Sequence, residues 1–134
     1  VDQAGFINAH TLNPCLAGKI TITENGDVLP CIFSRNQILG NVLASDLKSV
    51  MTEELLKNVW HTSKNRILVC QDCEYRYACS DCRPLAFGSN NNRDYLQAPP
   101  PRCTYNPYEG GWGNGVWLLN NIGHQHHVNR LSNL

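Results

Sequence analysis

Charge of either sign is scarce in this chain of 134 residues, and what is present balances. Charged residues make up 16% of the sequence, with 11 basic and 11 acidic side chains and a formal net charge of zero. Proteins bind nucleic acids and anionic membrane surfaces through clustered positive charge, which this composition does not supply. We therefore expect no nucleic-acid partner and no membrane partner.

Long hydrophobic runs are also missing. No apolar stretch approaches the roughly 18 residues that a membrane-spanning helix needs. The first residues contain no basic segment of the kind that opens a secretory signal peptide, and no Asn-x-Ser/Thr glycosylation sequence occurs. The chain begins with valine rather than methionine, so we expect a region of a longer protein.

Cysteine, in contrast, is abundant. The chain has seven cysteines, and this odd number would leave one thiol unpaired in a complete set of disulfides. They make up about 5% of the residues, below the roughly 8–10% that is typical of disulfide scaffolds. We therefore expect metal-bound thiolates in a reducing, cytoplasmic environment.

The spacing of the cysteines indicates which metal they bind. They are Cys15, Cys31, Cys70, Cys73, Cys79, Cys82 and Cys103, and the middle four form two Cys-x2-Cys pairs with five residues between them. Soft sulfur ligands select zinc or iron–sulfur clusters. Zinc would use the two pairs in one tetrahedron and leave three cysteines without a role. Two [4Fe–4S] clusters would use all seven, with one open iron, so we favour iron–sulfur and keep zinc as the alternative.

The region before the paired cysteines predicts a β-hairpin. Two β-branched runs, 19–23 and 27–31, flank Asn25-Gly26, which favours a type I′ turn because both central residues need positive φ. Cys15 precedes the first arm and Cys31 ends the second, so the hairpin would bring these two distant cysteines toward each other.

One helix is predicted over residues 45–61. Ser45 is a suitable N-cap, and the apolar residues that follow recur near helical spacing. They are Leu47, Val50, Met51, Leu55 and Val59. Cysteine-rich loops follow, and the runs 90–92 and 99–101 indicate further loops. The expected fold is a small, metal-stabilised α+β domain with an N-terminal β-hairpin, one packing helix and then cysteine-rich loops.

Other polar and aromatic residues give weaker signals. We expect Trp60, Trp112 and Trp117 to pack in the core. Asp72, Glu74 and Asp81 fit surface or turn positions, while Arg76 and Arg83 flank the cysteines and could act on an anionic cluster. No arrangement of carboxylates or serines indicates acid–base or nucleophilic catalysis, so no catalytic residue is assigned.

Taken together, the cysteine pattern resembles the SPASM domain of radical S-adenosylmethionine peptide maturases. The similarity includes Gly26 between the first two cysteines and extends to the segments 26–31, 39–42, 73–79 and 103–107. It covers residues 15–103. The resemblance implies a lead-in at 1–14 that continues from an upstream region and a C-terminal tail at 104–134.

The resemblance also implies which cysteines hold each cluster. The outer cluster would be held by four residues: Cys70, Cys73, Cys79 and Cys103. The inner cluster would be held by Cys15, Cys31 and Cys82. Positions 16–30 contain no further cysteine, so the inner cluster keeps an open iron, as in the thioether-forming branch. The chain departs from the family at Cys79 and Cys82, which form a Cys-x2-Cys pair where Cys-x3-Cys is usual.

The implied function is that of an auxiliary-cluster domain that binds a precursor peptide and relays electrons. No Cys-x3-Cys-x2-Cys motif occurs, so S-adenosylmethionine would bind only in the missing upstream barrel, and this chain alone should be inactive. Two other functions stay open. One is a non-enzymatic, zinc-stabilised binding module, and the other is a stand-alone ferredoxin-like electron-transfer protein.

Overall fold

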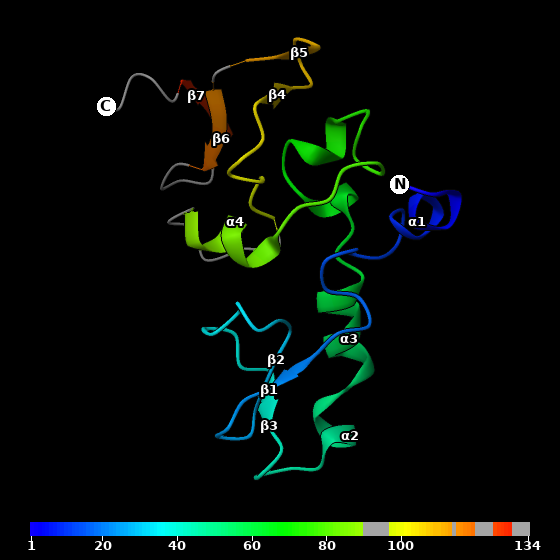
Figure 1. Cartoon of the computed structure of the whole chain (residues 1–134), viewed down its shortest axis with the longest axis vertical. Helices are drawn as coiled ribbons and strands as arrows, with labels where there is room; N and C mark the ends of the chain where they lie inside the picture. Colours follow the sequence, from blue (N-terminus) through cyan, green and yellow to red (C-terminus); the bar gives the residue numbers. More distant parts are fainter. Residues whose placement is uncertain (90–96, 114, 120–124, 130–134) are drawn as a thin grey trace.

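The computed structural model describes residues 1–89, 97–113, 115–119 and 125–129. Short helices and short antiparallel strands make up this part of the chain, which confirms a small α+β domain. Figure 1 shows a sheet with α2 (Leu47–Val50) at one end, the last strands at the other end, and α4 (Arg83–Ser89) between them. Helix α3 (Glu53–Trp60) runs between the two ends and leads into the cysteine-rich turns.

The predicted hairpin is present, but its turn differs from the prediction. Strands β1 (Thr21–Ile22) and β2 (Asp27–Leu29) pair antiparallel, and β3 (Gly40–Asn41) adds to the other edge of β2. Gly26 has a φ of 82°, whereas Asn25 is not among the positive-φ residues. The Gly26 amide donates to the Thr23 carbonyl, and the Thr23 amide donates to the Asp27 carbonyl. This is a three-residue loop with a glycine bulge, which the same Asn-Gly sequence also allows.

The single helix predicted over 45–61 is wrong, because two helices occupy this region. Asp46 rather than Ser45 is the N-cap of α2, and its carboxylate accepts from the Ser49 amide at 2.8 Å. Met51 ends α2 with a ψ of 58°. Thr52 is then followed by two acidic residues in the first turn of α3. Carboxylates there favour a new helix N-terminus, which explains the break.

Two helices fall where none was expected. Helix α1 (Gln3–Asn8) lies in the polar lead-in and is capped by the Asp2 carboxylate, which accepts from the Gly5 amide. Helix α4 begins directly after Cys82. Periodicity did not reveal either helix, because both are short and mostly lack a repeating apolar face.

The core is small and lies where α3 packs against the turn that contains Cys15 and Leu16. Leu16 and Val59 are its buried centre, and the partly buried residues packed against them are Cys15, Cys31, Leu39 and Trp60. A second cluster joins Ala86 of α4 to Ala98, with Leu68 packed against them. The core therefore brings the first two cysteines to the end of α3.

The C-terminal strands form two antiparallel pairs. Strand β4 (Tyr105–Asn106) pairs with β5 (Gly111–Trp112), and β6 (Gly115–Leu119) pairs with β7 (Gln125–Asn129). Trp117 is buried, and its indole N–H donates to the Tyr105 carbonyl at 2.8 Å. Trp112, which we expected in the core, is 72% exposed. The loop expected at 90–92 and the tail residues 130–134 lie outside the described residues.

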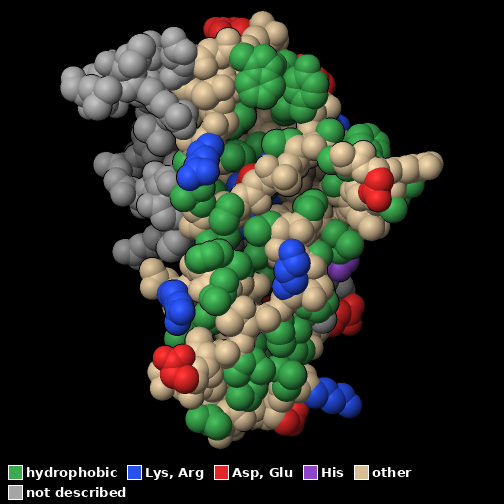
Figure 2. All heavy atoms as spheres, in the orientation of Figure 1, with side chains coloured by type: hydrophobic (Ala, Val, Ile, Leu, Met, Phe, Trp, Pro, Cys, Tyr) green, Lys and Arg blue, Asp and Glu red, His purple; other side chains and the backbone are tan. Residues whose placement is uncertain are grey.

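The surface carries little concentrated charge. Figure 2 shows acidic and basic side chains standing singly on one face, among many hydrophobic ones. In the described ranges, no helix has the length and apolar character that a bilayer span requires.

Candidate metal centre

Five of the seven cysteines line one cavity of about 410 Å³. They are Cys70, Cys73, Cys79, Cys82 and Cys103. The cavity lies between the two Cys-x2-Cys pairs and the segment 100–112, so Cys103 comes to the pairs from a distant part of the sequence. All four cysteines of the predicted outer set are therefore in its wall.

Local backbone geometry sets the position of the first cavity cysteine. Val69 has a φ of 67° and a ψ of −47°, close to the values of the rare and strained γ-turn. Cys70 follows at the start of η2 (Cys70–Asp72) and is 8% exposed. A β-branched residue in this region of φ is unusual and costs free energy. The sharp turn at Val69 directs the chain into the cysteine pair at the cavity wall.

Successive tight turns position the next two cysteines. The Cys73 amide donates to the Cys70 carbonyl, and the Cys79 amide donates to the Tyr75 carbonyl. The Arg76 guanidinium donates to the Cys73 carbonyl at 3.0 Å and lies over the Tyr77 ring. These bonds fold the run 70–79 into a compact unit that presents three thiols to one cavity.

Burial and repulsion from neighbouring groups raise the pKa values of two cavity thiols, Cys70 and Cys73. Burial raises the pKa of Cys70 to about 12, although the nearby Lys64 ammonium opposes the shift. Burial also raises the pKa of Cys73, and Glu74, Cys103 and Cys79 add repulsion. The thiolates of this set therefore interact with one another, and a metal ion would have to displace thiol protons to bind them.

Cys15, Cys31 and Cys82 form a second group. Burial raises the pKa of Cys15 most, and repulsion from Cys82 and Cys31 raises it further. The backbone N–H of Arg83 donates to the Cys15 sulfur and opposes this shift. The structure therefore brings Cys31 and Cys82, which were predicted with Cys15 as the inner set, within electrostatic reach of Cys15.

Asn13 holds the first of these cysteines in place, a role that the sequence did not suggest. Its side chain is 1% exposed, and its carbonyl oxygen accepts from the backbone amides of Cys15 at 2.9 Å and Leu16 at 3.1 Å. Its amide group donates to the Thr62 carbonyl at 2.9 Å. Asn13 thus ties the Cys15 turn to the end of α3.

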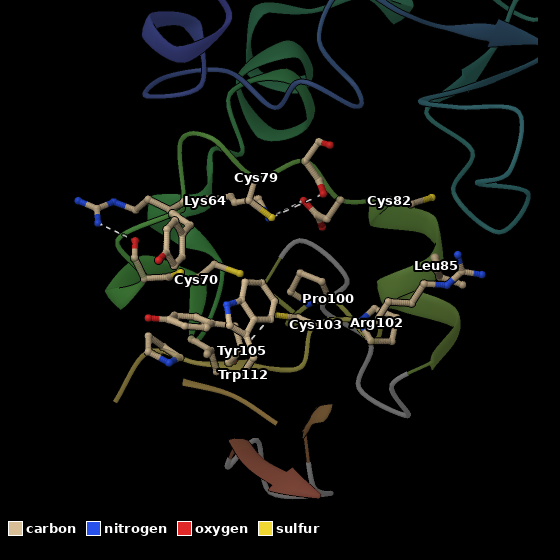
Figure 3. Close-up of a pocket in the computed structure, with 18 residues that line it drawn as sticks. Lys64, Cys70, Cys79, Cys82, Leu85, Pro100, Arg102, Cys103, Tyr105 and Trp112 are labelled. Carbon is tan, nitrogen blue, oxygen red and sulfur yellow. Dashed lines mark hydrogen bonds and ion pairs between the residues drawn. The ribbon is translucent and has the colours of Figure 1, made fainter. Parts of the chain in front are cut away.

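Cys82 lies between the two groups. It contributes to the cavity wall, but Figure 3 shows its sulfur pointing away from Cys70, Cys79 and Cys103, at the start of α4. Its sulfur is near enough to Cys15 to raise the pKa of that thiol. The direction of the side chain and this interaction both associate Cys82 with Cys15.

Charged side chains are buried beside the cysteines. Lys64 is 4% exposed and Arg83 is fully buried, and both form ion pairs with Asp81, whose side chain is 7% exposed. Our expectation of a surface or turn position for Asp81 is therefore wrong. The Lys64 ammonium also donates to the Cys79 sulfur at 3.4 Å. No periodicity or motif distinguishes this lysine in the sequence, so sequence reasoning missed it.

Aromatic side chains line the open side of the cavity. Tyr75 is 47% exposed and Trp112 is 72% exposed, with their ring centroids 6.4 Å apart. Tyr105 lies beneath them, and its ring centroid is 4.9 Å from that of Trp112. The phenol of Tyr105 donates to the Glu74 carboxylate. This rim gives the cysteine cavity an apolar entrance.

The residues present fit an iron–sulfur cluster. Among the described residues, no group of three or more His, Cys, Asp or Glu side chains is placed to hold a single metal ion. Thiolates are the ligands that iron–sulfur clusters take, and the cysteines stand around a cavity. The buried ammonium of Lys64 needs anionic neighbours, which cluster-bound thiolates would supply.

A comparison with protein families agrees with iron–sulfur binding, and the matched residues include every cysteine except Cys103. The family model SPASM, described as an iron-sulfur cluster-binding domain, matches residues 15–83, which is more than half of the chain. No curated protein and no solved structure matches the chain. The family match supports iron–sulfur binding over zinc.

Proposed function

Since the chain belongs to the SPASM family of iron–sulfur cluster-binding domains, we propose that its seven cysteines hold two [4Fe–4S] clusters. We further propose that these clusters serve a radical S-adenosylmethionine enzyme that modifies a ribosomally made peptide. The observation that carries the two-cluster proposal is the placement of Cys82: it lines the cavity with the four outer cysteines, but its sulfur points away from Cys70, Cys79 and Cys103 and acts on Cys15 together with Cys31. The clusters would supply electron uptake and release when bound.

In this proposal the quartet binds the outer cluster. Its members are Cys70, Cys73, Cys79 and Cys103. The support is their common cavity, together with the repulsion that Cys103 and Cys79 exert on Cys73 and that Cys103 exerts on Cys70. The first three come from one compact run of turns, and Cys103 would close the site from the opposite wall.

The trio Cys15, Cys31 and Cys82 binds the inner cluster and leaves one iron open. The support is the repulsion of the Cys15 thiol by both partners and the packing of Cys15 and Cys31 on one core. An open iron suits the capture of a substrate thiol, and we propose thioether formation as the reaction served. S-adenosylmethionine itself would bind to a separate radical domain.

The peptide substrate would approach through the aromatic rim. Tyr75 and Trp112 expose large rings at the mouth of the cavity, and Tyr105 supports them. Exposed aromatic groups bind peptides with little loss of conformational entropy. In this proposal the rim binds the peptide, and the apolar walls exclude water. The buried cations Lys64 and Arg83 stabilise the negative charge of the cluster.

Spectroscopy of cysteine variants tests the ligand sets. The chain would be reconstituted anaerobically with iron and sulfide, reduced and examined by electron paramagnetic resonance. Cys103→Ser should lose one cluster signal, and Cys15→Ser should lose the other. Loss of the same signal in both variants would contradict the two sets.

A small thiol tests the open iron. N-acetylcysteine methylamide added to the reconstituted protein should change the signal that Cys15→Ser abolishes. The signal that Cys103→Ser abolishes should not change. An unchanged spectrum at saturating thiol would refute the open corner while leaving the two-cluster proposal intact.

A further inference from the structure

Three ionised side chains are buried between the two cysteine groups. Lys64 is 4% exposed, the side chain of Asp81 is 7% exposed, and Arg83 has no exposed surface. We name these three residues the charge bridge. Ionised side chains are rarely buried this deeply unless they are paired, so their position between two sets of thiolates calls for an explanation.

Contacts connect the charge bridge to both cysteine groups. The Lys64 ammonium lies 3.2 Å from one oxygen of Asp81 and 3.4 Å from the Cys79 sulfur. The Arg83 side chain donates to the other Asp81 oxygen at 2.6 Å through Nε, and to the Ala98 carbonyl at 2.7 Å. The backbone N–H of Arg83 donates to the Cys15 sulfur. A continuous path therefore runs from Cys79 to Cys15.

Asp81 and Lys64 differ in the cysteines on which their charges act. The Asp81 carboxylate repels the thiolates of both Cys15 and Cys70, so it acts on both groups. Lys64 attracts the thiolates of Cys70 and Cys79, which belong to the outer group. The Asp81 carboxylate therefore acts on both cysteine groups, whereas the Lys64 ammonium acts on the outer group.

Lys64 is buried against acidic partners. Its ammonium lies 3.2 Å from an oxygen of Asp81 and 3.4 Å from the sulfur of Cys79. Burying the Lys64 ammonium is unfavourable unless anions lie next to it, and the Asp81 carboxylate and the Cys79 sulfur are the groups that it contacts.

We propose that the charge bridge sets the difference in reduction potential between the two clusters, with Lys64 acting on the outer cluster and Asp81 acting on both. This inference rests on the two-cluster function proposed above. A nearby cation stabilises the more negative, reduced cluster and so raises its potential, and a nearby anion lowers it. Lys64 and Asp81 are positioning residues here, since they act through the ligating cysteines.

The test is a potentiometric titration of the anaerobically reconstituted chain, followed by electron paramagnetic resonance. The outer signal is the one lost in Cys103→Ser, and the inner signal is the one lost in Cys15→Ser. Lys64→Gln removes the charge but keeps a hydrogen-bond donor. Lys48→Gln makes the same change in net charge at an exposed residue of α2 and is the matched control.

Lys64→Gln should make the outer cluster harder to reduce. At a fixed potential the ratio of reduced to oxidised outer cluster should fall at least tenfold, which is about 59 mV for one electron. The inner signal should move much less, and Lys48→Gln should move neither. Equal shifts in Lys64→Gln and Lys48→Gln would overturn the proposal.

Asp81→Asn should raise the potentials of both clusters, because its carboxylate acts on both groups. A purely structural role for Asp81 would not shift two clusters in the same direction. If Asp81→Asn does not load iron, the double variant Lys64→Gln/Asp81→Asn removes one charge of each sign. It should leave the outer potential near that of the unmodified chain and raise the inner one, and an unmoved inner potential would refute the proposal.

The iron content separates this inference from the proposed function. If the unmodified chain binds only one cluster, the two-cluster function fails and this inference fails with it. If both clusters form but Lys64→Gln and Asp81→Asn leave their potentials unchanged, only the inference fails.

Discussion

Individual buried polar residues hold the cysteines in place, and Asn13 shows how. It joins the backbone amides of Cys15 and Leu16 to the Thr62 carbonyl, across almost 50 residues of sequence. A buried polar group that loses its partner bears the full cost of its desolvation. Asn13 therefore contributes to the position of Cys15 and to the stability of the fold.

Asn13→Ala should destabilise the reconstituted protein by about 1–3 kcal/mol for each buried group left without a partner. Anaerobic urea unfolding followed by circular dichroism measures this change. Asn36→Ala, at an exposed asparagine, should change the free energy of unfolding by less than about 0.5 kcal/mol. Similar stabilities of the two variants would contradict the role given to Asn13.

At the level of single residues, the sequence identified the cysteines but not the groups around them. Cysteine spacing is a local pattern that can be read directly, and all four predicted outer ligands line one cavity. Lys64 and Asn13 gave no such signal, because their roles depend on contacts with residues far away in the chain. Asp81 was misplaced for the same reason, since a short turn sequence does not show which cations lie beside it.

At the level of secondary structure elements, close packing joins the small sheet to α2. Gly40 of β3 lies against Val50 of α2, and a Cβ atom at Gly40 would come within 2.7 Å of a Val50 methyl carbon. Such contacts do not occur without a shift of the backbone or the neighbour. Gly40 is therefore needed for the close approach of the strand to the helix.

Gly40→Ala should destabilise the protein by about 1–3 kcal/mol through overpacking. Val50→Ala removes the opposing methyl groups, so the double variant should be more stable than the sum of the single effects predicts, by about 0.5 kcal/mol or more. Urea unfolding of all three variants completes the cycle. Gly111→Ala, where a Cβ atom meets nothing within 4 Å, is the control. Additive effects of Gly40→Ala and Val50→Ala would contradict the packing argument.

The N-cap of α2 makes a second prediction at this level. Hydrogen bonds from the Ser49 backbone and hydroxyl lower the pKa of Asp46 below its ordinary value of 3.8. A lowered pKa means that ionised Asp46 stabilises the folded state above that value, and that this stabilisation is lost only as the pH falls through the folded pKa. The contribution of the cap should therefore be constant from pH 8 to pH 6.

Asp46→Ala should speed hydrogen exchange of the Ser49 amide, and the ratio of its rate to that of the unmodified chain should be the same at pH 6 and pH 8. Asp46→Ser, which retains a capping oxygen, should restore most of the protection. Nuclear magnetic resonance or mass spectrometry of the exchanged protein measures the rates. Unchanged exchange in Asp46→Ala would show that Asp46 does not cap the helix.

In these elements, sequence patterns predicted the type of secondary structure but not its details. The two β-branched runs around Asn25-Gly26 correctly predicted a hairpin, but the turn type depends on the φ of one residue, which the pattern does not determine. The apolar spacing of 47–59 predicted helix but not the break at Met51. That break depends on competition between continuing one helix and starting another at two acidic residues.

At the level of the whole molecule, the fold brings together cysteines from three separated regions. The core around Leu16 and Val59 brings Cys15 to Cys31, and the cavity brings Cys103 to the two Cys-x2-Cys pairs. The hairpin pattern predicted the approach of Cys15 to Cys31. Local patterns did not show the approach of Cys103 to the two pairs, and there a family resemblance supplied the expectation. The family match now extends that resemblance to iron–sulfur binding.

The iron content of the unmodified chain tests the central claim most directly. After anaerobic reconstitution and removal of unbound iron, the two-cluster account predicts about eight irons and about eight sulfides per chain, as two [4Fe–4S] clusters require. About four irons per chain, or zinc in place of iron, would contradict it.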